Sequence, residues 1–149
     1  MTRLSSAFGG VDNLRIKSFE LAGHTFKVRV PLTKEMDEIN ERVKKIDQKE
    51  AKKRYEKMTK GFTDGIEGVI VSEDDVVVDG RSTKELVETV MMMENRIVEF
   101  IKLLIPEEGT LSDITYEEIE AEWPMSVQLE IVGKISDVIQ PGYKEERKN

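Results

Sequence analysis

Hydrophobic and polar residues alternate in the first part of the chain with the period of a β-strand. Two apolar segments flank Ala22 and Gly23, and their apolar positions are Ile16, Phe19 and Leu21 before the pair and Phe26, Val28 and Val30 after it. Lys27 and Arg29 fall on the opposite face of the second segment. Gly23 can supply a turn, and Pro31 ends the second strand because it has no N–H. The pattern predicts a β-hairpin.

After Pro31 the apolar spacing changes to three and four residues, which is typical of an amphipathic helix. Thr33 can cap a helix that begins at Lys34, and its apolar positions are Met36, Ile39, Val43 and Ile46. Beyond Ile46 the apolar stripe thins among lysines as far as Lys60. We therefore expect one helix with exposed later turns, which the glycines at 61, 65 and 68 end.

Two short runs of valine and isoleucine follow, at residues 69–71 and 76–78, on either side of the polar residues 72–75. Such runs predict two short strands around a turn, and a short helix is the alternative.

The strongest helix signal lies near the middle of the chain. Ser82 and Glu85 form a capping box, in which each side chain can bond an unpaired amide of the first turn. A broad apolar stripe follows, made of Leu86, Val87, Val90, Met91, Met93, Ile97, Val98, Phe100, Ile101, Leu104 and Ile105. Pro106 ends the stripe. A stripe this wide predicts a helix buried on two sides.

Two further helices are predicted in the C-terminal part. Thr115 and Glu118 form a second capping box, which opens a short acidic helix ending at Trp123-Pro124. The apolar positions of the last helix are Met125, Leu129, Val132, Ile135 and Ile139. Pro141 and Gly142 end it.

These elements predict an α+β fold, with an N-terminal β-hairpin or small antiparallel sheet followed by a mainly α-helical bundle. The expected organisation is a flexible N-terminal arm over residues 1–13, one domain over residues 14–140 and a charged C-terminal tail over residues 141–149. A chain of 149 residues is long enough for one core.

Charge is distributed unevenly along the chain. Residues 1–60 carry 15 basic and 9 acidic side chains, a net charge of +6, whereas residues 61–149 carry 8 and 21, a net charge of −13. This asymmetry can steer a charged partner or favour self-association, so a homo-oligomer is expected. Two differently solvated surfaces are the plainer explanation.

The sequence contains no cysteine, which excludes disulfides, thiol nucleophiles and cysteine-based metal sites. No secretory leader or membrane-spanning run is evident, so we expect a cytoplasmic protein without a membrane partner. The basic stretch from Lys44 to Lys60 is interrupted by acidic residues, and the net charge opposes phosphate binding, so no nucleic acid is expected.

No pattern of residues indicates catalysis, a metal or a cofactor. Paired carboxylates occur at Asp74-Asp75, Glu107-Glu108 and Glu117-Glu118, but all lie in predicted turns or first helical turns, where solvation explains them. His24 is the only histidine and lies at the predicted hairpin turn, without the further ligands of a zinc site. The chain is therefore predicted not to be an enzyme.

The candidate functional residues belong instead to a partner-binding surface. Met91 and Met93 resemble the adaptable methionines of proteins that bind varied apolar partners, although core packing is the commoner role. The remaining candidates are Ile97, Ile101 and Trp123. Trp123 fits either an interface or a clamp between the two C-terminal helices. Leu86 is expected to be buried, and Met91 and Met93 to lie at the exposed edge of the stripe.

The order of elements resembles the tail assembly chaperones of long-tailed bacteriophages, of the lambda type. The segments that carry the resemblance are FELAGHTFKVRVPLTKEMDEINERV (19–43), DGRSTKELVETVMMMENRIVEFIKLLI (79–105) and YEEIEAEWPMSVQLEIVGKI (116–135). The resemblance implies a late protein of the host cytoplasm, absent from the mature virion, that binds the tape-measure protein and keeps it soluble until tail-tube subunits assemble around it. It also implies a second, longer frameshifted product, and it implies neither cofactor nor metal.

Two alternatives remain open at this stage. A structural head–tail connection protein, or another small acidic interaction module, would have the same composition but stay in the particle. An acidic inhibitor that imitates nucleic acid would use the charge of the second half, although its carboxylates are scattered among apolar positions.

Overall fold

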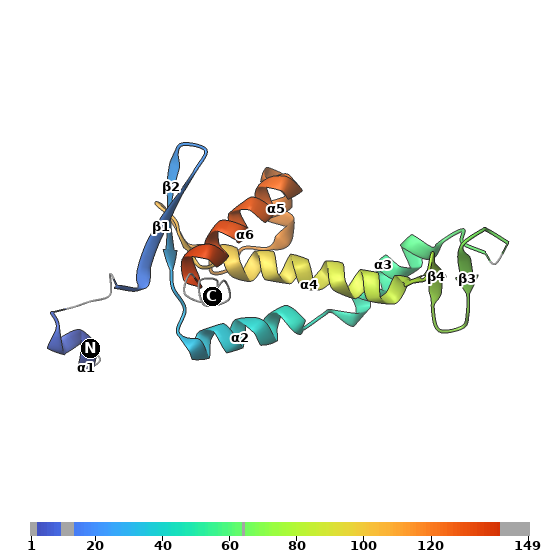
Figure 1. Ribbon diagram of the computed structural model, residues 1–149, viewed down its shortest axis with the longest axis horizontal. Coiled ribbons are helices and arrows are strands. Elements are labelled where there is room, and N and C mark those ends of the chain that lie inside the picture. The colour runs from blue at the N-terminus through green and yellow to red at the C-terminus, as the bar shows by residue number, and fades with distance from the viewer. Residues whose placement is uncertain (1–2, 10–13, 64, 141–149) are drawn as a thin grey trace, which may run out of the picture. The chain divides into compact units, whose positions relative to one another are not determined.

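The structure is a computed structural model that describes residues 3–9, 14–63 and 65–140. Its helices and strands confirm the predicted α+β class and the N-terminal antiparallel sheet (Figure 1). The elements are α1 (Arg3–Ala7), β1 (Ile16–Leu21), β2 (His24–Arg29), α2 (Thr33–Lys44), α3 (Gln48–Thr59), β3 (Val69–Val71), β4 (Val76–Val78), β5 (Arg81–Ser82), α4 (Thr83–Ile101), β6 (Leu104–Ile105), α5 (Tyr116–Glu122) and α6 (Met125–Ile139).

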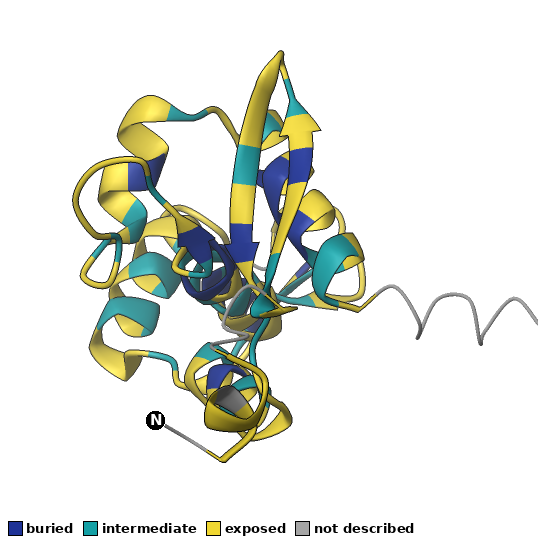
Figure 2. Cartoon of the chain, turned by 90° about the vertical axis from the view of Figure 1, so that its left-hand side faces the viewer, coloured by how far each residue is buried: buried dark blue, intermediate teal, exposed yellow. Residues whose placement is uncertain are grey.

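Strands β1 and β2 form the predicted hairpin, with Leu21 opposite His24 across a two-residue turn. Ala22 and Gly23 both have positive φ, 53° and 77°, as the turn type that fits the twist of a hairpin requires. Exposed residues alternate with buried or half-buried residues along β2 (Figure 2), and Val28 is completely buried. The period-two pattern therefore places the correct face toward the core.

The predicted single helix over residues 34–60 is wrong, because the structure contains two helices there, α2 and α3. Asp47 caps α3, since its carboxylate accepts hydrogen bonds from the amides of Lys49 at 2.9 Å and Glu50 at 3.3 Å. The Asn95 side chain donates to the carbonyls of Val43 (3.1 Å) and Lys45 (2.9 Å) at the end of α2. The break is thus held by side chains that replace helical hydrogen bonds.

The two strands predicted over residues 69–78 are confirmed as β3 and β4, and β5 joins them in a second antiparallel sheet. The amide of Glu85 donates to the Ser82 hydroxyl at 3.2 Å, as the predicted capping box requires for its first bond. Helix α4 follows directly from this sheet.

Helix α4 ends at Ile101, so the prediction that it continues to Pro106 is wrong. After a tighter last turn, in which the amide of Leu103 donates to Phe100, the carbonyl of Leu103 accepts from Arg29 of the hairpin at 2.9 Å. Leu104 and Ile105 then form β6, which pairs with β2. Pairing with a strand more than 70 residues earlier outweighs the helical pattern of these residues.

The C-terminal helices α5 and α6 form as predicted, and Thr115 caps α5 by accepting from the amide of Glu118 at 3.3 Å. Within the arm predicted to be irregular, residues 3–7 are helical. Residues 1–2 and 10–13 of the predicted arm lie outside the described residues. The predicted charged tail, residues 141–149, lies outside them as well.

The chain forms two compact units, one made of residues 1–40 and 97–149 and the other of residues 41–96. The buried apolar side chains of the first unit include Val28, Ile97, Phe100, Ile101, Leu104, Ile119, Ile131 and Ile135. Those of the second unit are Val69, Val76, Val87 and Met91. That residues 14–140 behave as one domain stays a prediction.

Candidate functional site

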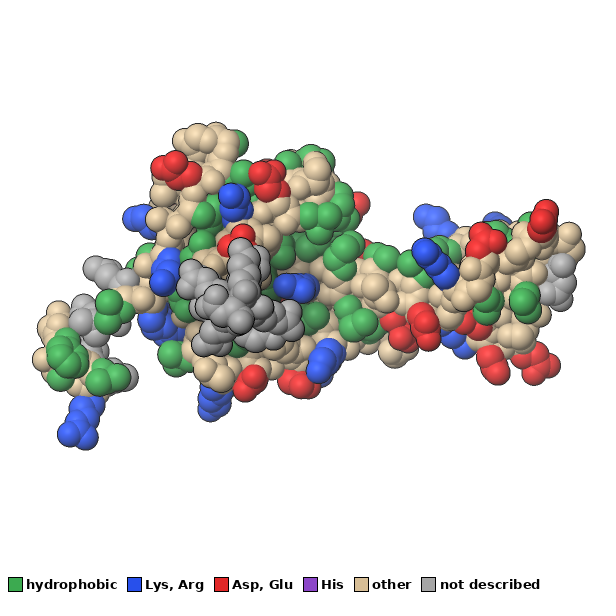
Figure 3. All heavy atoms as spheres, in the orientation of Figure 1, with side chains coloured by type: hydrophobic (Ala, Val, Ile, Leu, Met, Phe, Trp, Pro, Cys, Tyr) green, Lys and Arg blue, Asp and Glu red, His purple; other side chains and the backbone are tan. Residues whose placement is uncertain are grey.

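The first unit contains an apolar hollow of about 500 Å³ beside the three-stranded sheet. It is bordered by β2, the end of α4, β6, the loop after β6 and α5. The lining residues include Phe26, Leu104, Ile105, Leu111, Ile114 and Trp123. Hydrophobic side chains are visible on the surface over α5 and α6 (Figure 3). A hollow of this size and lining is typical of a site that binds apolar groups.

Among the residues that the structure describes, β6 leaves part of the backbone edge of β2 beside this hollow unpaired. The amides of Arg29 and Val30 bond to opposite sides, Arg29 to Leu103 at 2.9 Å and Val30 to Arg15 at 2.6 Å. Successive residues of β2 therefore direct their backbone groups alternately toward β1 and toward the side on which β6 lies. Thr25, which lines the hollow, is four residues before Arg29, so its backbone groups point to the β6 side. Strand β6 pairs only with Lys27 and Val28, so the edge at Thr25 borders the hollow.

Pro106 and the loop after it form another wall of the hollow. The proline has no amide hydrogen to continue the ladder beyond Ile105. In the loop, the amide of Ile114 donates to the carbonyl of Leu111 at 3.2 Å. This turn brings the two apolar residues of an otherwise polar loop to the same wall.

Charged groups lie at the rim of the hollow. The Nε2 atom of His24 lies 3.8 Å from Oε1 of Glu107, and both side chains are mostly exposed. The His24 ring packs edge-on against Phe26, with 4.7 Å between the ring centroids. Glu122 and Lys27 also line the hollow. An apolar floor with charged groups around it suits a side chain or segment that is apolar with polar flanks.

Trp123 is held in place by a buried polar network. The Gln128 amide nitrogen donates to the Trp123 carbonyl at 2.8 Å, and the Tyr116 hydroxyl donates to Gln128 Oε1 at 3.0 Å. Gln128 is almost completely buried. These bonds tie α5 to α6 and hold the backbone at Trp123, whose half-buried side chain lines the hollow.

The structure brings only two of the five predicted partner-binding residues to the hollow, Ile101 and Trp123. Met91, Ile97 and Ile101 are buried, with exposed fractions of 7%, 1% and 1%, and Met93 is half-buried. The expectation that Met91 lies at an exposed edge is therefore wrong. The partner-binding role of these residues stays a prediction.

Leu86 was expected in the core, but its side chain is 47% exposed. It lines a shallow hollow of about 550 Å³ in the second unit, together with Met58, Phe62 and Val78. Leu86 lies in the first turn of α4, where the neighbouring Thr83 takes the buried position and donates to the carbonyl of Val76 at 2.6 Å.

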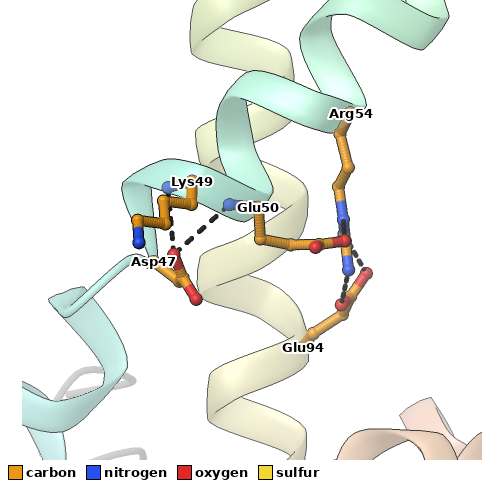
Figure 4. Close-up of polar contacts among 5 residues, drawn as sticks. All are labelled: Asp47, Lys49, Glu50, Arg54 and Glu94. Atoms are coloured by element: carbon orange, nitrogen blue, oxygen red, sulfur yellow. Dashed lines mark hydrogen bonds and ion pairs between the residues drawn. The ribbon is translucent and has the colours of Figure 1, made fainter.

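The second unit also contains a bidentate ion pair, in which one guanidinium bonds to both oxygens of a carboxylate. Arg54 donates to both carboxylate oxygens of Glu94, at 2.7 and 2.8 Å, and also to Glu50 at 3.3 Å (Figure 4). The hydrogen bonds with Glu94 raise the pKa of Arg54 above its ordinary value. This arrangement ties α3 to α4 and leaves the guanidinium occupied.

Asp75 has a specific structural role that solvation does not explain. Its carboxylate accepts hydrogen bonds from the Ser82 hydroxyl and from the amides of Val76 (2.8 Å) and Lys84 (3.2 Å). Burial acts to raise the pKa of Asp75, but these hydrogen bonds outweigh it and the pKa is lowered. Burial and the Asp75 charge raise the pKa of the neighbouring Tyr55.

Within residues 3–9, 14–63 and 65–140, no three His, Cys, Asp or Glu side chains gather where they could hold a metal ion. None of the helices in these ranges has the length and apolar character needed to cross a bilayer.

The chain matches no protein-family model, and neither the curated proteins nor the solved structures include a significant match.

Proposed function

We propose that this chain is a bacteriophage tail assembly chaperone that binds and solubilises the tape-measure protein, helps to recruit tail-tube subunits and performs no catalysis. The observation that carries the proposal is the apolar hollow of about 500 Å³ in the first unit. On this proposal the protein acts in the host cytoplasm and is absent from the finished virion.

The chemistry of the hollow supports a protein client. Its floor is apolar, which suits the apolar side chains of a long helical or extended protein. The open backbone edge at Thr25 can pair with an extended segment, in the way that peptides add to the edges of sheets. The acidic second half of the chain keeps the complex charged and therefore soluble.

A co-expression experiment tests the proposal. The neighbouring gene for a long coiled-coil protein is expressed with the wild-type chain and with Ile105→Asp, and the soluble fraction of the client is measured. Ile105 is 36% exposed and lines the hollow, so an aspartate there is tolerated in the free chain but opposes an apolar client. We expect the variant to melt like the wild type and to leave the client insoluble.

Leu129→Asp is the matched control, because Leu129 is 49% exposed and lies on α6 away from the hollow. It introduces the same charge and should preserve client solubility. A wild-type chain that neither binds nor solubilises the client would refute the chaperone proposal. Retention of the chain in purified particles would favour the structural head–tail connection protein instead.

A further inference from the structure

The hollow beside the three-stranded sheet borders a short stretch of strand edge. The amide of Arg29 bonds to Leu103, at the start of the contact between β2 and the chain around β6. Lys27 pairs with Ile105, and among the described residues the ladder stops there. Thr25 is the next residue of β2 whose N–H and C=O point to the β6 side, because backbone groups alternate in direction along a strand. Since Thr25 lines the hollow, these two groups face an extended segment that enters it.

The floor beside Thr25 fits an apolar side chain of such a segment. A guest residue opposite Thr25 exchanges two hydrogen bonds with it, and the next guest residue lies opposite His24. Because side chains alternate between the faces of a sheet, that next residue lies on the same face as Phe26. Phe26 lines the hollow together with Leu104 and Trp123. The guest therefore needs an apolar side chain directly beside the residue that pairs with Thr25.

Negative charge surrounds this floor. Residues 106–123 contain seven carboxylates and no lysine or arginine, and all seven carboxylates are exposed. Glu107 and Glu122 line the hollow itself, where Lys27 is the opposing charge. In the described part of the chain, the ion pair made by these carboxylates joins Glu107 to His24, at 3.8 Å. A rim of this charge attracts a guest that carries lysine or arginine on both sides of its apolar residue.

We propose that the hollow binds an extended segment of another protein, in which one apolar residue is flanked on both sides by lysine or arginine. The segment adds to the edge of β2 at Thr25, its apolar side chain occupies the floor, and its basic side chains meet the carboxylates of the rim. The inference rests on the proposed function for the identity of the partner, and it names the kind of client segment that the hollow takes.

The fluorescence of Trp123 provides the measurement, because Trp123 is the only tryptophan of the chain and lines the hollow. The purified chain is titrated with a blocked peptide of the order Lys-Arg-Thr-Leu-Thr-Arg-Lys. We expect a saturable change in emission, with an affinity that falls between about 20 mM and about 500 mM salt because exposed charges are screened. An emission that does not change up to about 1 mM peptide would overturn the proposal.

Altered peptides test each part of the recognition. Glutamine in place of every basic residue should weaken binding roughly tenfold, and glutamate there should abolish it. Serine in place of the leucine should also weaken binding roughly tenfold, because the floor then gains no apolar contact. Esters in place of both threonine amides remove the N–H donors and should weaken binding about threefold to tenfold. A neutral peptide that binds as tightly as the basic one would overturn the role of the rim, and an ester peptide that binds as tightly would overturn the strand pairing.

Thr25→Pro removes the amide that faces the hollow, and Ser18→Pro is its matched control. The amide of Val30 bonds to Arg15, so by alternation neither Thr25 nor Ser18 contributes hydrogen bonds to the β1–β2 ladder. Both prolines therefore spare the hairpin, and the one at Ser18 lies at the opposite edge of the sheet. We expect both variants to melt alike and only Thr25→Pro to lose affinity for the peptide. Equal affinity of the two folded variants would contradict pairing at Thr25, and the ester peptide decides the question if Thr25→Pro unfolds.

Glu107→Gln with Glu122→Gln tests the rim in the chain itself. Its control is Glu41→Gln with Glu73→Gln, which removes the same charge from two exposed residues of the second unit. The first pair should weaken peptide binding roughly tenfold and the second pair less than about twofold. Equal weakening by the two pairs would show that net charge alone attracts the peptide, and would overturn the proposal.

The peptide titration and the co-expression experiment have separate outcomes. A chain that binds the peptide as expected but leaves the client insoluble would refute the chaperone proposal and support the preference of the hollow. A chain that keeps the client soluble but does not bind the peptide would overturn the present inference alone.

Discussion

Replacement of Asp75 by alanine should destabilise the junction between β4 and α4. The substitution removes three hydrogen bonds, from the Ser82 hydroxyl and from the amides of Val76 and Lys84. Hydrogen bonds to charged groups are worth about 1.5–3 kcal/mol when buried, and about 1 kcal/mol is reasonable for each where water can replace part of the bond. The three bonds together predict a loss of about 3 kcal/mol.

Hydrogen exchange of the amides in the first turn of α4, together with denaturant unfolding followed by circular dichroism, measures this loss. Asp74→Ala is the control, because Asp74 is the adjacent exposed carboxylate and its removal should cost less than about 0.5 kcal/mol. Equal losses for the two variants would show that general charge in this turn, and not the hydrogen bonds of Asp75, stabilises the junction.

The stability difference between the wild type and Asp75→Ala should also depend on pH. Since the pKa of Asp75 is lower in the folded protein than its ordinary value, the stabilisation is fully present above the unfolded value of about 3.9 and is lost as the pH falls through the folded value. The difference in stability between the wild type and Asp75→Ala should therefore be constant from about pH 7 to about pH 5 and shrink below about pH 4. A difference that does not change in acid would contradict the carboxylate as its source.

Two further substitutions test the packing of the second unit. Met91→Ala should cost about 2–5 kcal/mol and Leu86→Ala less than about 1 kcal/mol, because the first side chain is buried and the second is half exposed, and equal losses in thermal unfolding would contradict this assignment. Arg54→Met should cost about 1–3 kcal/mol by leaving Glu94 without its bidentate partner, whereas adding Glu94→Leu should recover part of that loss. A double-mutant cycle with no coupling energy would show that the pair contributes nothing.

Local signals in the sequence predicted the elements whose structure depends on neighbouring residues. The hairpin follows from a period of two around Gly23, and α5 follows from a capping box whose hydrogen bond forms within four residues of Thr115. Such elements need no information from distant parts of the chain, because the turn or cap and the apolar face lie in one segment.

The errors arose in two different ways. The break between α2 and α3 had a local signal, since Asp47 followed three residues later by Glu50 is itself a helix-start pattern. The strand at Leu104–Ile105 had none, because its apolar spacing is equally typical of a helix and only pairing with β2 decides between them. The pairing of these residues with β2 cannot be inferred from the pattern of a single sequence.

The candidate site was only partly predicted for the same reason. Ile101 was identified as part of the broad apolar stripe and Trp123 as the end of the short acidic helix, but the hollow also needs Ile105, Leu111 and Ile114. The sequence did contain one signal for the hollow, because Leu111 and Ile114 are apolar residues in an otherwise polar loop. Their importance depends on the early end of α4, which creates the wall that they complete.

On the proposed function, the longest apolar stripe of this chain is a poor guide to where the client binds. A continuous stripe such as that of α4 would promote aggregation if it were exposed, so the fold buries it, as the exposed fractions of Met91 and Ile97 illustrate. The apolar surface of the hollow in the first unit is instead made of short pieces from β2, β6 and α5, with carboxylates between them. Charge at the rim keeps such a surface soluble without filling its floor, which is the combination that reversible binding of an apolar client requires.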